Sequence, residues 1–333
     1  MVLVTGGTGL VGSHLLYFLL KKGVAVRAIH RKSSKLASVR EVFKFYTEDP
    51  HSLYNSIEWM EADVTDIPAL KKAFEGVTQV YHSAAYISFN PRHFQKLKKS
   101  NIEGTANIVN LCIEHKVSKL CHVSSIATLG STTDGSLIDE QVAWNPEANN
   151  SVYAITKYGA EMEVWRGTQE GVDAVILNPA LIMGSGYWRS GSGVIVNMVA
   201  KESKYYTSGG VAIVDVQDVV KAMIMLMESE IRNEQFILAG ENLRYKELLS
   251  KLAASLEVKP PSKLIPKWKL DLVRRLDWLS AKLTGSRRRL LKATVNSMYK
   301  ESYYDGGKIT RYLDFKYTPA DETLARIGEN FRK

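Results

Sequence analysis

The chain has 333 residues, of which 45% are hydrophobic and 24% are charged. This ordinary globular composition excludes a disordered or low-complexity chain, and no apolar run approaches the ~18 residues that a membrane span needs. The net charge is +9, from 44 Lys and Arg against 35 Asp and Glu. The chain carries no nucleic-acid-binding signature, so we expect a basic, solvated surface and no nucleic-acid partner.

The cysteines and histidines also limit the classes of site. Cys112 and Cys121 are too few for a disulfide framework or a four-ligand zinc site, and the histidines show no metal-ligand spacing. We therefore expect free thiols and no metal. The chain opens on a strand-like run at 2–5 and shows no signal-peptide pattern, so a cytoplasmic location is expected.

The first half of the chain alternates between two kinds of apolar pattern. Short apolar runs predict buried strands at 2–5, 24–29, 57–60, 79–82, 119–124 and 173–178. Helical periodicity predicts helices at 10–22, 69–75, 94–115 and 153–168, and a further helix at 36–46. Strands that alternate with helices indicate an α/β fold with a doubly wound parallel sheet.

After residue 179 this rhythm breaks. The pattern predicts a helix at 194–201, a strand at 211–214, a helix at 216–228 and a turn at 259–261, followed by a helical, basic stretch. We predict a nucleotide-binding domain at 1–178 and a smaller, mostly helical substrate domain at 179–333. The strand and helix near 211–228 are expected to return to the first domain.

The basic stretch at 265–289 is amphipathic. Apolar residues recur every three or four positions from Ile265 to Leu283, with lysines and arginines mostly between them. Such a helix either lies on a membrane surface or packs its apolar stripe on the substrate domain as a lid. The sequence favours the lid.

A glycine-rich turn directly follows the first strand and opens the first helix. Gly6 permits a sharp turn, Gly9 permits close approach of a pyrophosphate, and Gly12 permits tight packing of helix on strand. Backbone N–H groups at the start of the helix then bind the phosphates. The turn predicts a dinucleotide site in a Rossmann fold, held by Gly6, Thr8, Gly9, Leu10, Val11 and Gly12.

The end of the second strand indicates which dinucleotide is preferred. An NAD site usually places an acidic residue there for the ribose 2′-hydroxyl, but this strand ends in Arg31 and Lys32, with Lys35 behind them. A guanidinium suits a 2′-phosphate. The sequence therefore favours NADP, with NAD as the alternative.

A tyrosine and a lysine share one face of a predicted helix. Tyr153 and Lys157 are four residues apart, and the preceding strand delivers Ser124 and Ser125 at its carboxyl end. These groups suit hydride transfer to a carbonyl: the tyrosine is the acid/base, the ammonium lowers its pKa, and a serine holds the substrate oxygen.

These motifs resemble the extended short-chain dehydrogenase/reductases, also called the NAD-dependent epimerase/dehydratase family. The resemblance covers nearly the whole chain, through the glycine turn and the segments 62–66, 82–85, 101–105, 124–125, 153–157, 178–184 and 214–219. It implies that Tyr153 is the acid/base, that Lys157 binds the nicotinamide ribose, and that the serine is Ser125. It further implies a homodimer paired through helices 94–115 and 153–168. The additional cofactor contacts that it implies are Asp63, Val64, Ala84, Ala85, Pro179 and Ile182.

Within the family, the Val26-Arg27-Ala28-x-x-Arg31 pattern is similar to the dihydroflavonol-reductase and hydroxysteroid-dehydrogenase-like branch, which acts on apolar carbonyls or alcohols. Members that act on sugar nucleotides usually carry an arginine in the segment that corresponds to residues 209–214. This chain has no arginine there. Predicted substrate-pocket residues are Tyr86, Ser125, Tyr187 and Trp188, with Phe89, Tyr205 and Tyr206 as further candidates.

The sequence thus predicts an NADP-preferring oxidoreductase that interconverts a carbonyl and a secondary alcohol on a small, mostly apolar substrate. A sugar-nucleotide epimerase or dehydratase that retains its NAD is the alternative enzyme. A non-catalytic dinucleotide sensor is disfavoured, because a pure binding protein does not need Ser125, Tyr153 and Lys157 together.

Overall fold

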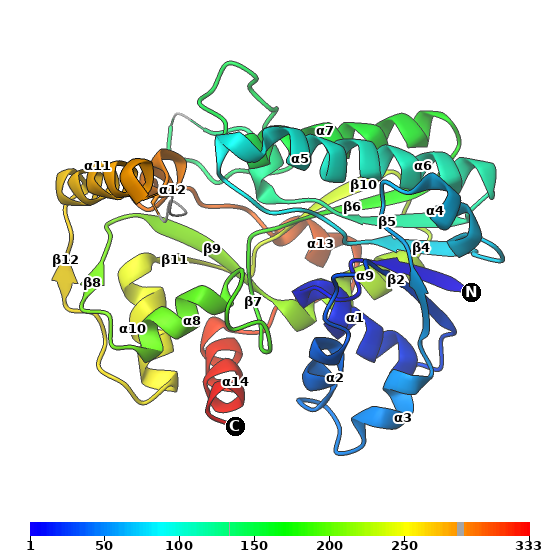
Figure 1. Cartoon of the computed structure of the whole chain (residues 1–333), viewed down its shortest axis with the longest axis horizontal. Coiled ribbons are helices and arrows are strands. Elements are labelled where there is room, and N and C mark those ends of the chain that lie inside the picture. The colour runs from blue at the N-terminus through cyan, green and yellow to red at the C-terminus, as the bar shows by residue number, and fades with distance from the viewer. Residues whose placement is uncertain (133, 285–289) are drawn as a thin grey trace.

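A seven-stranded parallel sheet forms the centre of the larger lobe in this computed structural model, which describes residues 1–132, 134–284 and 290–333 (Figure 1). The strand order is β10-β6-β5-β4-β1-β2-β3, and every neighbouring pair is parallel. The α/β, doubly wound prediction is therefore confirmed. The strands are β1 (Val2–Thr5), β2 (Val26–His30), β3 (Glu58–Glu61), β4 (Gln79–His82), β5 (Lys119–Val123), β6 (Ala174–Pro179) and β10 (Glu234–Leu238).

Helices cover both faces of this sheet (Figure 1). One face carries α1 (Leu10–Lys21), α2 (Ala37–Phe43), α3 (Pro50–Asn55) and α9 (Val216–Glu228). The other carries α4 (Ile67–Ala73), α5 (Phe94–Leu97), α6 (Gly104–Glu114) and α7 (Val152–Gln169). Each face has its own buried apolar cluster, around Phe43 and Met223 on the first and around Phe74 and Ile108 on the second. Because both faces are covered, the strands read as continuous apolar runs.

The helix predicted at 94–115 is interrupted. The structure has the short turn η1 (Pro91–His93), then α5, a π-helical stretch η2 (Lys98–Glu103) and α6. The π turn contains buried Asn101, whose amide bonds the backbone of Tyr86 in the loop after β4. Such turns are frequent at functional sites.

The smaller lobe contains a three-stranded sheet of order β11-β9-β7. Its strands and helices are β7 (Leu181–Met183), β9 (Gly210–Asp215), β11 (Glu241–Arg244), α8 (Gly193–Ala200), α10 (Tyr245–Ser255) and α14 (Ala320–Arg332). A two-stranded ribbon, α12 and α13 complete the chain: β8 (Tyr205–Tyr206), β12 (Lys263–Leu264), α12 (Lys292–Ser297) and α13 (Gly307–Tyr312). Buried Leu248, Leu252 and Leu324 form the core of this lobe.

Two predictions for the second half are wrong. The strand near 211 does not return to the large sheet: β9 pairs with β7 and β11, because β10 already occupies the edge beside β6. Its successor α9 does return, and packs against α1. The stretch after 261 is not uniformly helical either, since it includes β12 and an extended segment that bridges Tyr304 to Ile138.

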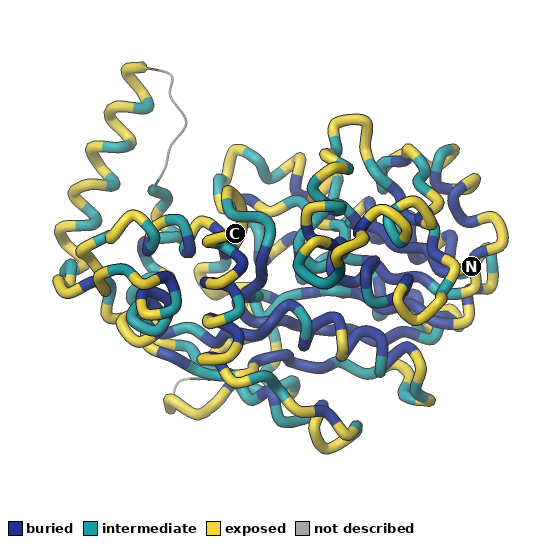
Figure 2. Tube along the Cα trace, turned by 90° about the horizontal axis from the view of Figure 1, so that it is seen from below, coloured by how far each residue is buried: buried dark blue, intermediate teal, exposed yellow. Residues whose placement is uncertain are grey.

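The amphipathic helix α11 (Lys267–Thr284) does not pack as predicted. None of its residues is buried, and it contacts mainly α12. Figure 2 shows it standing off from the rest of the small lobe. The predicted packing of its apolar stripe on the substrate domain is therefore wrong. Residues 285–289 of the predicted stretch lie outside the described residues. Within the described ranges, no helix is both long and apolar enough to cross a bilayer.

The three predicted glycines of the turn between β1 and α1 differ in how much space surrounds them. Gly6 has φ of +73°, and a Cβ there would lie 2.6 Å from the Ala84 nitrogen. A Cβ on Gly12 would lie 2.2 Å from the Gly6 oxygen, closer than any packing allows. A Cβ on Gly9 would meet only that oxygen, at 3.4 Å. Gly6 and Gly12 are thus needed for the fold, and Gly9 leaves space in front of the helix.

Exchanging these glycines for alanine should separate stability from ligand binding. We expect Gly12→Ala to cost about 1–3 kcal/mol of unfolding free energy, because the methyl group must displace the backbone of Gly6. Gly9→Ala has room and an ordinary φ of −100°, so its Tm should stay close to that of the parent. Its methyl group should instead weaken binding of NADPH, the expected ligand. Thermal unfolding and calorimetric titration measure the two effects; equal melting temperatures for the two variants would contradict this division of roles.

Candidate active site

A hollow lies at the carboxyl edge of the large sheet, in front of the start of α1. Loops that follow four neighbouring strands line it, as expected for ligand sites of doubly wound sheets. The lining residues are Gly6, Thr8, Gly9, Ile29, His30, Arg31, Ser34, Ala62, Asp63, Val64, Ser83, Ala84, Ala85, Tyr86 and Ser100. Eight of the predicted cofactor residues are among them. Ile29, His30, Ser34, Ala62, Ser83 and Ser100 were not predicted.

Hydrogen bonds within the loops fix the walls of this hollow. The carboxylate of Asp63 accepts from the Thr65 nitrogen at 2.9 Å and from its hydroxyl at 2.7 Å. The Ala84 nitrogen donates to the hydroxyl of Thr5, which also bonds His82 Nδ1 at 2.7 Å. The loops after β3 and β4 are therefore held in place by the protein itself.

One end of the hollow is strongly charged. Arg31 lines this end, and together with Lys32 and Ser33 it also lines a second hollow that adjoins the first. Arg31 forms no ion pair with any other described residue. Lys35 lines neither hollow. Two carboxylates were not predicted here: Glu61 and Asp66 line the adjoining hollow. Glu61 is the last residue of β3, and the register of β3 against β2 places it beside His30. Glu61 could therefore have been predicted to lie here only from the pairing of these two strands.

The three predicted catalytic residues come from the end of β5 and the start of α7. Ser151 caps α7 by accepting from the Ala154 nitrogen, which sets Tyr153 and Lys157 on the first turns of the helix. Ser125 lies close enough to Tyr153 for its hydroxyl to lower the pKa of the phenol, whereas the hydroxyl of Ser124 donates to buried Glu161. Of the two serines, Ser125 is the one that faces the tyrosine.

Burial dominates the acidity of Tyr153. It raises the pKa of this phenol to about 12, and the hydrogen bond with Ser125 opposes the rise only in part. The predicted lowering of this pKa by the lysine is therefore wrong for this structure. The reason is geometric, since the Lys157 ammonium donates to the Val123 carbonyl at 3.0 Å. At neutral pH Tyr153 keeps its proton and is a donor.

Lys157 lies one turn after the tyrosine on α7. Its side chain is almost fully buried, which lowers the pKa of the ammonium to about 8, while the Glu161 carboxylate one turn further along α7 opposes that shift. Glu161 also accepts from Thr128 at 2.9 Å and from the Asn178 amide at 2.8 Å. This network gives the buried ammonium a negative partner nearby.

Two buried amides position the surrounding loops. Asn178, at the end of β6, donates to the Ser125 carbonyl at 3.1 Å and so holds the backbone of that serine. Asn101 bonds both the nitrogen and the carbonyl of Tyr86 and donates to Thr156 on α7. Sequence reasoning assigned neither amide a role, although both fall within segments that carry the family resemblance.

Other predicted residues lie around the site without lining the first hollow. Leu10 and Val11 form the first turn of α1, where backbone N–H groups lack helical acceptors. Pro179 is buried at the end of β6, and Ile182 is half-buried in the core beside β9. The Tyr187 hydroxyl donates to the Thr8 carbonyl at 2.9 Å and so braces the glycine turn.

The aromatic candidates of the small lobe are not gathered at Tyr153. The ring of Trp188 packs edge-on against Phe331 of α14, at 5.0 Å between centroids. Tyr205 and Tyr206 lie on β8, in the ribbon with β12. Phe89 does reach the site, because its ring meets that of Tyr153 at 5.5 Å.

The residues present fit a dinucleotide. The space that a Gly9 side chain would fill faces the hollow, and α1 presents the positive end of its dipole there. Among the described residues, no group of three or more His, Cys, Asp or Glu side chains is arranged to hold a metal ion.

Comparison with known proteins finds a family match and related reductases. The NAD-dependent epimerase/dehydratase family matches residues 2–239. A Synechocystis sp. protein provisionally named dihydroflavonol 4-reductase is 27% identical over 97% of this chain and 92% of its own length. Cinnamoyl-CoA reductase 1 of Petunia hybrida is 26% identical over 75% of this chain and 77% of its own.

Solved structures share the whole architecture. The structure titled gox2253 has a TM-score of 0.79 and 27% identity, and covers 100% of this chain and 98% of its own. The UDP-glucose 4-epimerase of Thermotoga maritima has a TM-score of 0.76 at 21% identity, covering 99% of this chain and 98% of its own, which shows the shared fold. The match to more than half of the chain establishes that this protein belongs to the NAD-dependent epimerase/dehydratase family.

Proposed function

We propose that the protein is an NADP-preferring oxidoreductase that interconverts a carbonyl and a secondary alcohol on a small, mostly apolar substrate. The observation that carries this proposal is the proximity of Ser125 to Tyr153, where hydrogen bonds of Ser124 and Thr128 to Glu161 join the end of β5 to α7, at the edge of the sheet where the dinucleotide hollow lies. A bound nicotinamide would supply the hydride. The residues that would hold the dinucleotide are those of the glycine turn, Arg31, Asp63 and the loop at 83–86.

The chain's own groups supply the proton and the orientation. In the reducing direction the protonated phenol of Tyr153 donates to the substrate oxygen, and Ser125 holds that oxygen by a second hydrogen bond. Lys157, whose ammonium donates to the Val123 carbonyl, would hold the nicotinamide ribose next to the pair. Glu161 and Asn178 keep the lysine and the serine in place.

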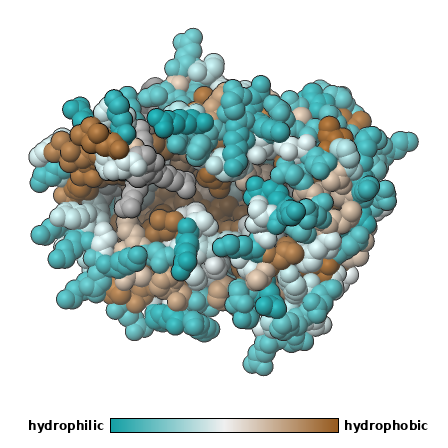
Figure 3. Space-filling view, in the orientation of Figure 1, coloured by the Kyte–Doolittle hydropathy of each residue, from teal (hydrophilic) through white to brown (hydrophobic). Residues whose placement is uncertain are grey.

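The surroundings favour an apolar substrate. The face in Figure 3 is hollowed near its centre, between the small lobe and the sheet edge, and apolar side chains form the floor of the hollow. Phe89 adds an aromatic ring beside Tyr153. The names of relatives, which include reductases of dihydroflavonol and cinnamoyl-CoA, support a carbonyl substrate of this kind.

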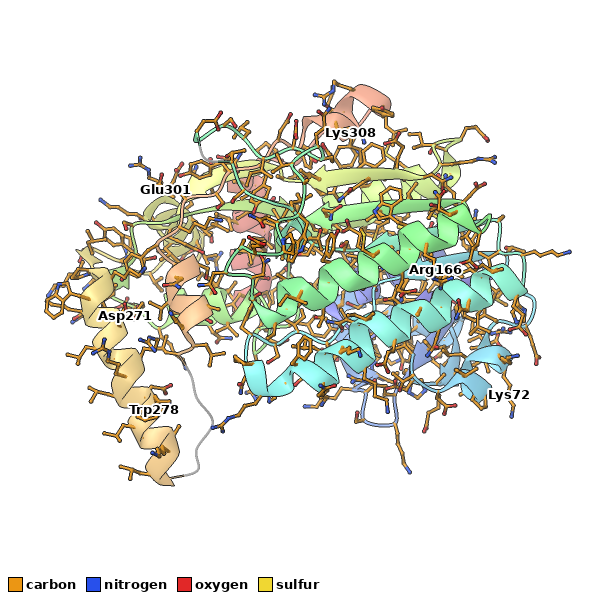
Figure 4. All side chains as sticks on the ribbon, turned by 90° about the horizontal axis from the view of Figure 1, so that it is seen from above. Lys72, Arg166, Asp271, Trp278, Glu301 and Lys308 are labelled. Atoms are coloured by element: carbon orange, nitrogen blue, oxygen red, sulfur yellow. The ribbon has the colours of Figure 1, made fainter. Side chains whose placement is uncertain are left out.

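A homodimer and a cytoplasmic location belong to the same proposal. The helices expected to pair, α6 and α7, lie side by side on the outer layer, where Arg166 of α7 bonds Asn110 of α6 (Figure 4). Ile155 and Met162 are exposed on α7 and supply apolar surface for a partner.

Removing the phenolic hydroxyl should abolish turnover without loss of the cofactor. Tyr153→Phe keeps the ring, so we expect NADPH affinity to change little while the rate of NADPH oxidation falls about 10²-fold or more. The rate is measured with the best substrate from a panel of ketones and aldehydes. Tyr158→Phe is the matched control, since Tyr158 lies on the same helix and stacks on Trp144. Full activity of the Tyr153→Phe protein would reject the mechanism.

Arg31 should determine the choice between the two dinucleotides. A charge-assisted phosphate contact contributes about 1.5–3 kcal/mol, so Arg31→Ala should weaken NADPH roughly 10- to 100-fold and leave NADH nearly unchanged. Glu61→Gln removes a negative charge from the adjoining hollow and should bind NADPH at least as tightly as the parent. Calorimetric titration of both cofactors checks this; a parent protein that prefers NADH would refute it.

Sugar nucleotides should bind poorly. A diphosphate is costly to bury without a cationic partner, and the segment 209–214 offers no arginine. We expect planar apolar ketones to bind the cofactor-loaded protein, and uridine- and thymidine-diphosphate sugars to show no saturable binding in the same titration. Arg189, in the loop between β7 and α8, is the arginine that could replace the missing cationic partner. Saturable low-micromolar binding of a sugar nucleotide that Arg189→Ala abolishes would therefore favour the epimerase alternative.

A further inference from the structure

One face of α11 exposes a continuous apolar stripe. Its residues are Trp268, Leu272, Leu276, Leu279 and Leu283, which we call the α11 stripe. They are 63%, 52%, 58%, 45% and 76% exposed. Their spacing of three or four residues places all five on one side of the helix. Apolar side chains accordingly gather over α11 in Figure 3.

The opposite side of α11 holds the helix to the small lobe. Leu270, Asp271, Arg274, Asp277 and Ala281 are the half-buried positions of its mid-section. Asp277 accepts from the Leu290 nitrogen at 3.2 Å, just before α12, which is the helix that α11 contacts. Asp271 lies on this same side of α11 and pairs within the helix with Arg274 at 2.9 Å (Figure 4). Just before the helix, the Ile265 carbonyl accepts from the Tyr299 hydroxyl at 2.7 Å. The contacts to the lobe thus come from the other side, and the α11 stripe faces outward.

Cations flank the stripe on both sides. On the helix, Lys269 falls beside one margin, and Arg275 and Lys282 fall beside the other. Over its whole length α11 has five Lys and Arg against two Asp, a net charge of +3. A wide apolar stripe between basic margins is the pattern of helices that lie in a membrane interface.

The two tryptophans strengthen this interpretation. The Lys269 ammonium lies 5.4 Å from the Trp268 ring, and the Lys282 ammonium lies 5.4 Å from the Trp278 ring. Each pair places an indole and an ammonium together, as at the level of lipid headgroups, where indoles are enriched and lysines extend toward phosphate.

We propose that α11 docks the protein on an anionic lipid surface, with the α11 stripe at the boundary of the acyl chains and Lys269, Arg275 and Lys282 among the headgroups. Attachment is peripheral, since α11 is not apolar enough to span a bilayer. Charge favours this occupant over a second copy of the chain, because pairing two stripes would bring two helices of net charge +3 together.

Vesicle co-sedimentation tests the proposal with the full chain. We expect binding to vesicles that contain about 30% phosphatidylglycerol, weaker binding to phosphatidylcholine alone, and a loss of binding as salt rises from about 0.1 M to about 0.5 M. Leu272→Gln with Leu276→Gln preserves helix propensity and should lower the partition coefficient at least about tenfold. An unchanged Tm shows that this variant is folded.

A charge-matched pair of variants isolates the cations. Each lysine or arginine near an anionic surface changes partitioning roughly fivefold, so replacing Lys269, Arg275 and Lys282 by Gln should lower it at least about tenfold. The control replaces Lys72, Lys98 and Lys116 by Gln, which lowers the net charge equally; Lys72 lies on α4 at the far end of the molecule (Figure 4). Its partitioning should match the parent within about twofold.

Three results would overturn the proposal. The first is equal binding to neutral and anionic vesicles, or none to either. The second is a charge control that loses as much binding as the α11 variant. The third is a lipid-free dimer that the Leu272→Gln, Leu276→Gln protein no longer forms, without vesicle binding by the parent, which would assign the stripe to a second copy. Sedimentation velocity measures the third.

Discussion

The site depends on the hydrogen bonds that the buried carboxylate of Glu161 accepts. It accepts from Ser124 at the end of β5, from Asn178 at the end of β6 and from Gln235 on β10, so it links three strands to α7. It also stabilises the charge of Lys157, which is buried with little other compensation. Without this acceptor, several buried donors would lose their partner and the Lys157 ammonium would lose its nearby negative charge, at a cost far above that of a surface ion pair.

The site and the first half of the fold were largely predictable, for a local reason. Strands buried on both faces leave short continuous apolar runs, and the glycine turn needs particular residues at fixed spacing because backbone atoms of Gly6 and Gly12 come so close. Tyr153 and Lys157 share a helical face whatever surrounds them. These features depend on neighbours in sequence, so the sequence displays them.

The features that the sequence did not predict depend on contacts between segments that are distant in the sequence. β10 is half polar, and only its pairing with β6 reveals it as a sheet strand. Glu61 reaches the Arg31 end of the site through the register of β3 against β2. The periodicity of α11 predicted a stripe, but the direction in which the stripe faces was set by contacts of Asp277 and by the Tyr299 hydrogen bond just before the helix. The acidity of Tyr153 likewise depends on burial, which no spacing encodes.

Two buried histidines show how the sheet limits positive charge near the buried Lys157. His82 and His122 lie side by side on β4 and β5, with ring centroids 5.1 Å apart. Burial, followed by the charge of Lys157, lowers the pKa of both imidazoles, that of His82 to about 3. Both rings therefore stay neutral at physiological pH, so neither imidazole adds a second positive charge near the Lys157 ammonium. The neutral His82 ring is held between the hydroxyls of Thr5 on β1 and Thr105 on α6, and so joins these two elements to β4 without repelling the buried ammonium of Lys157.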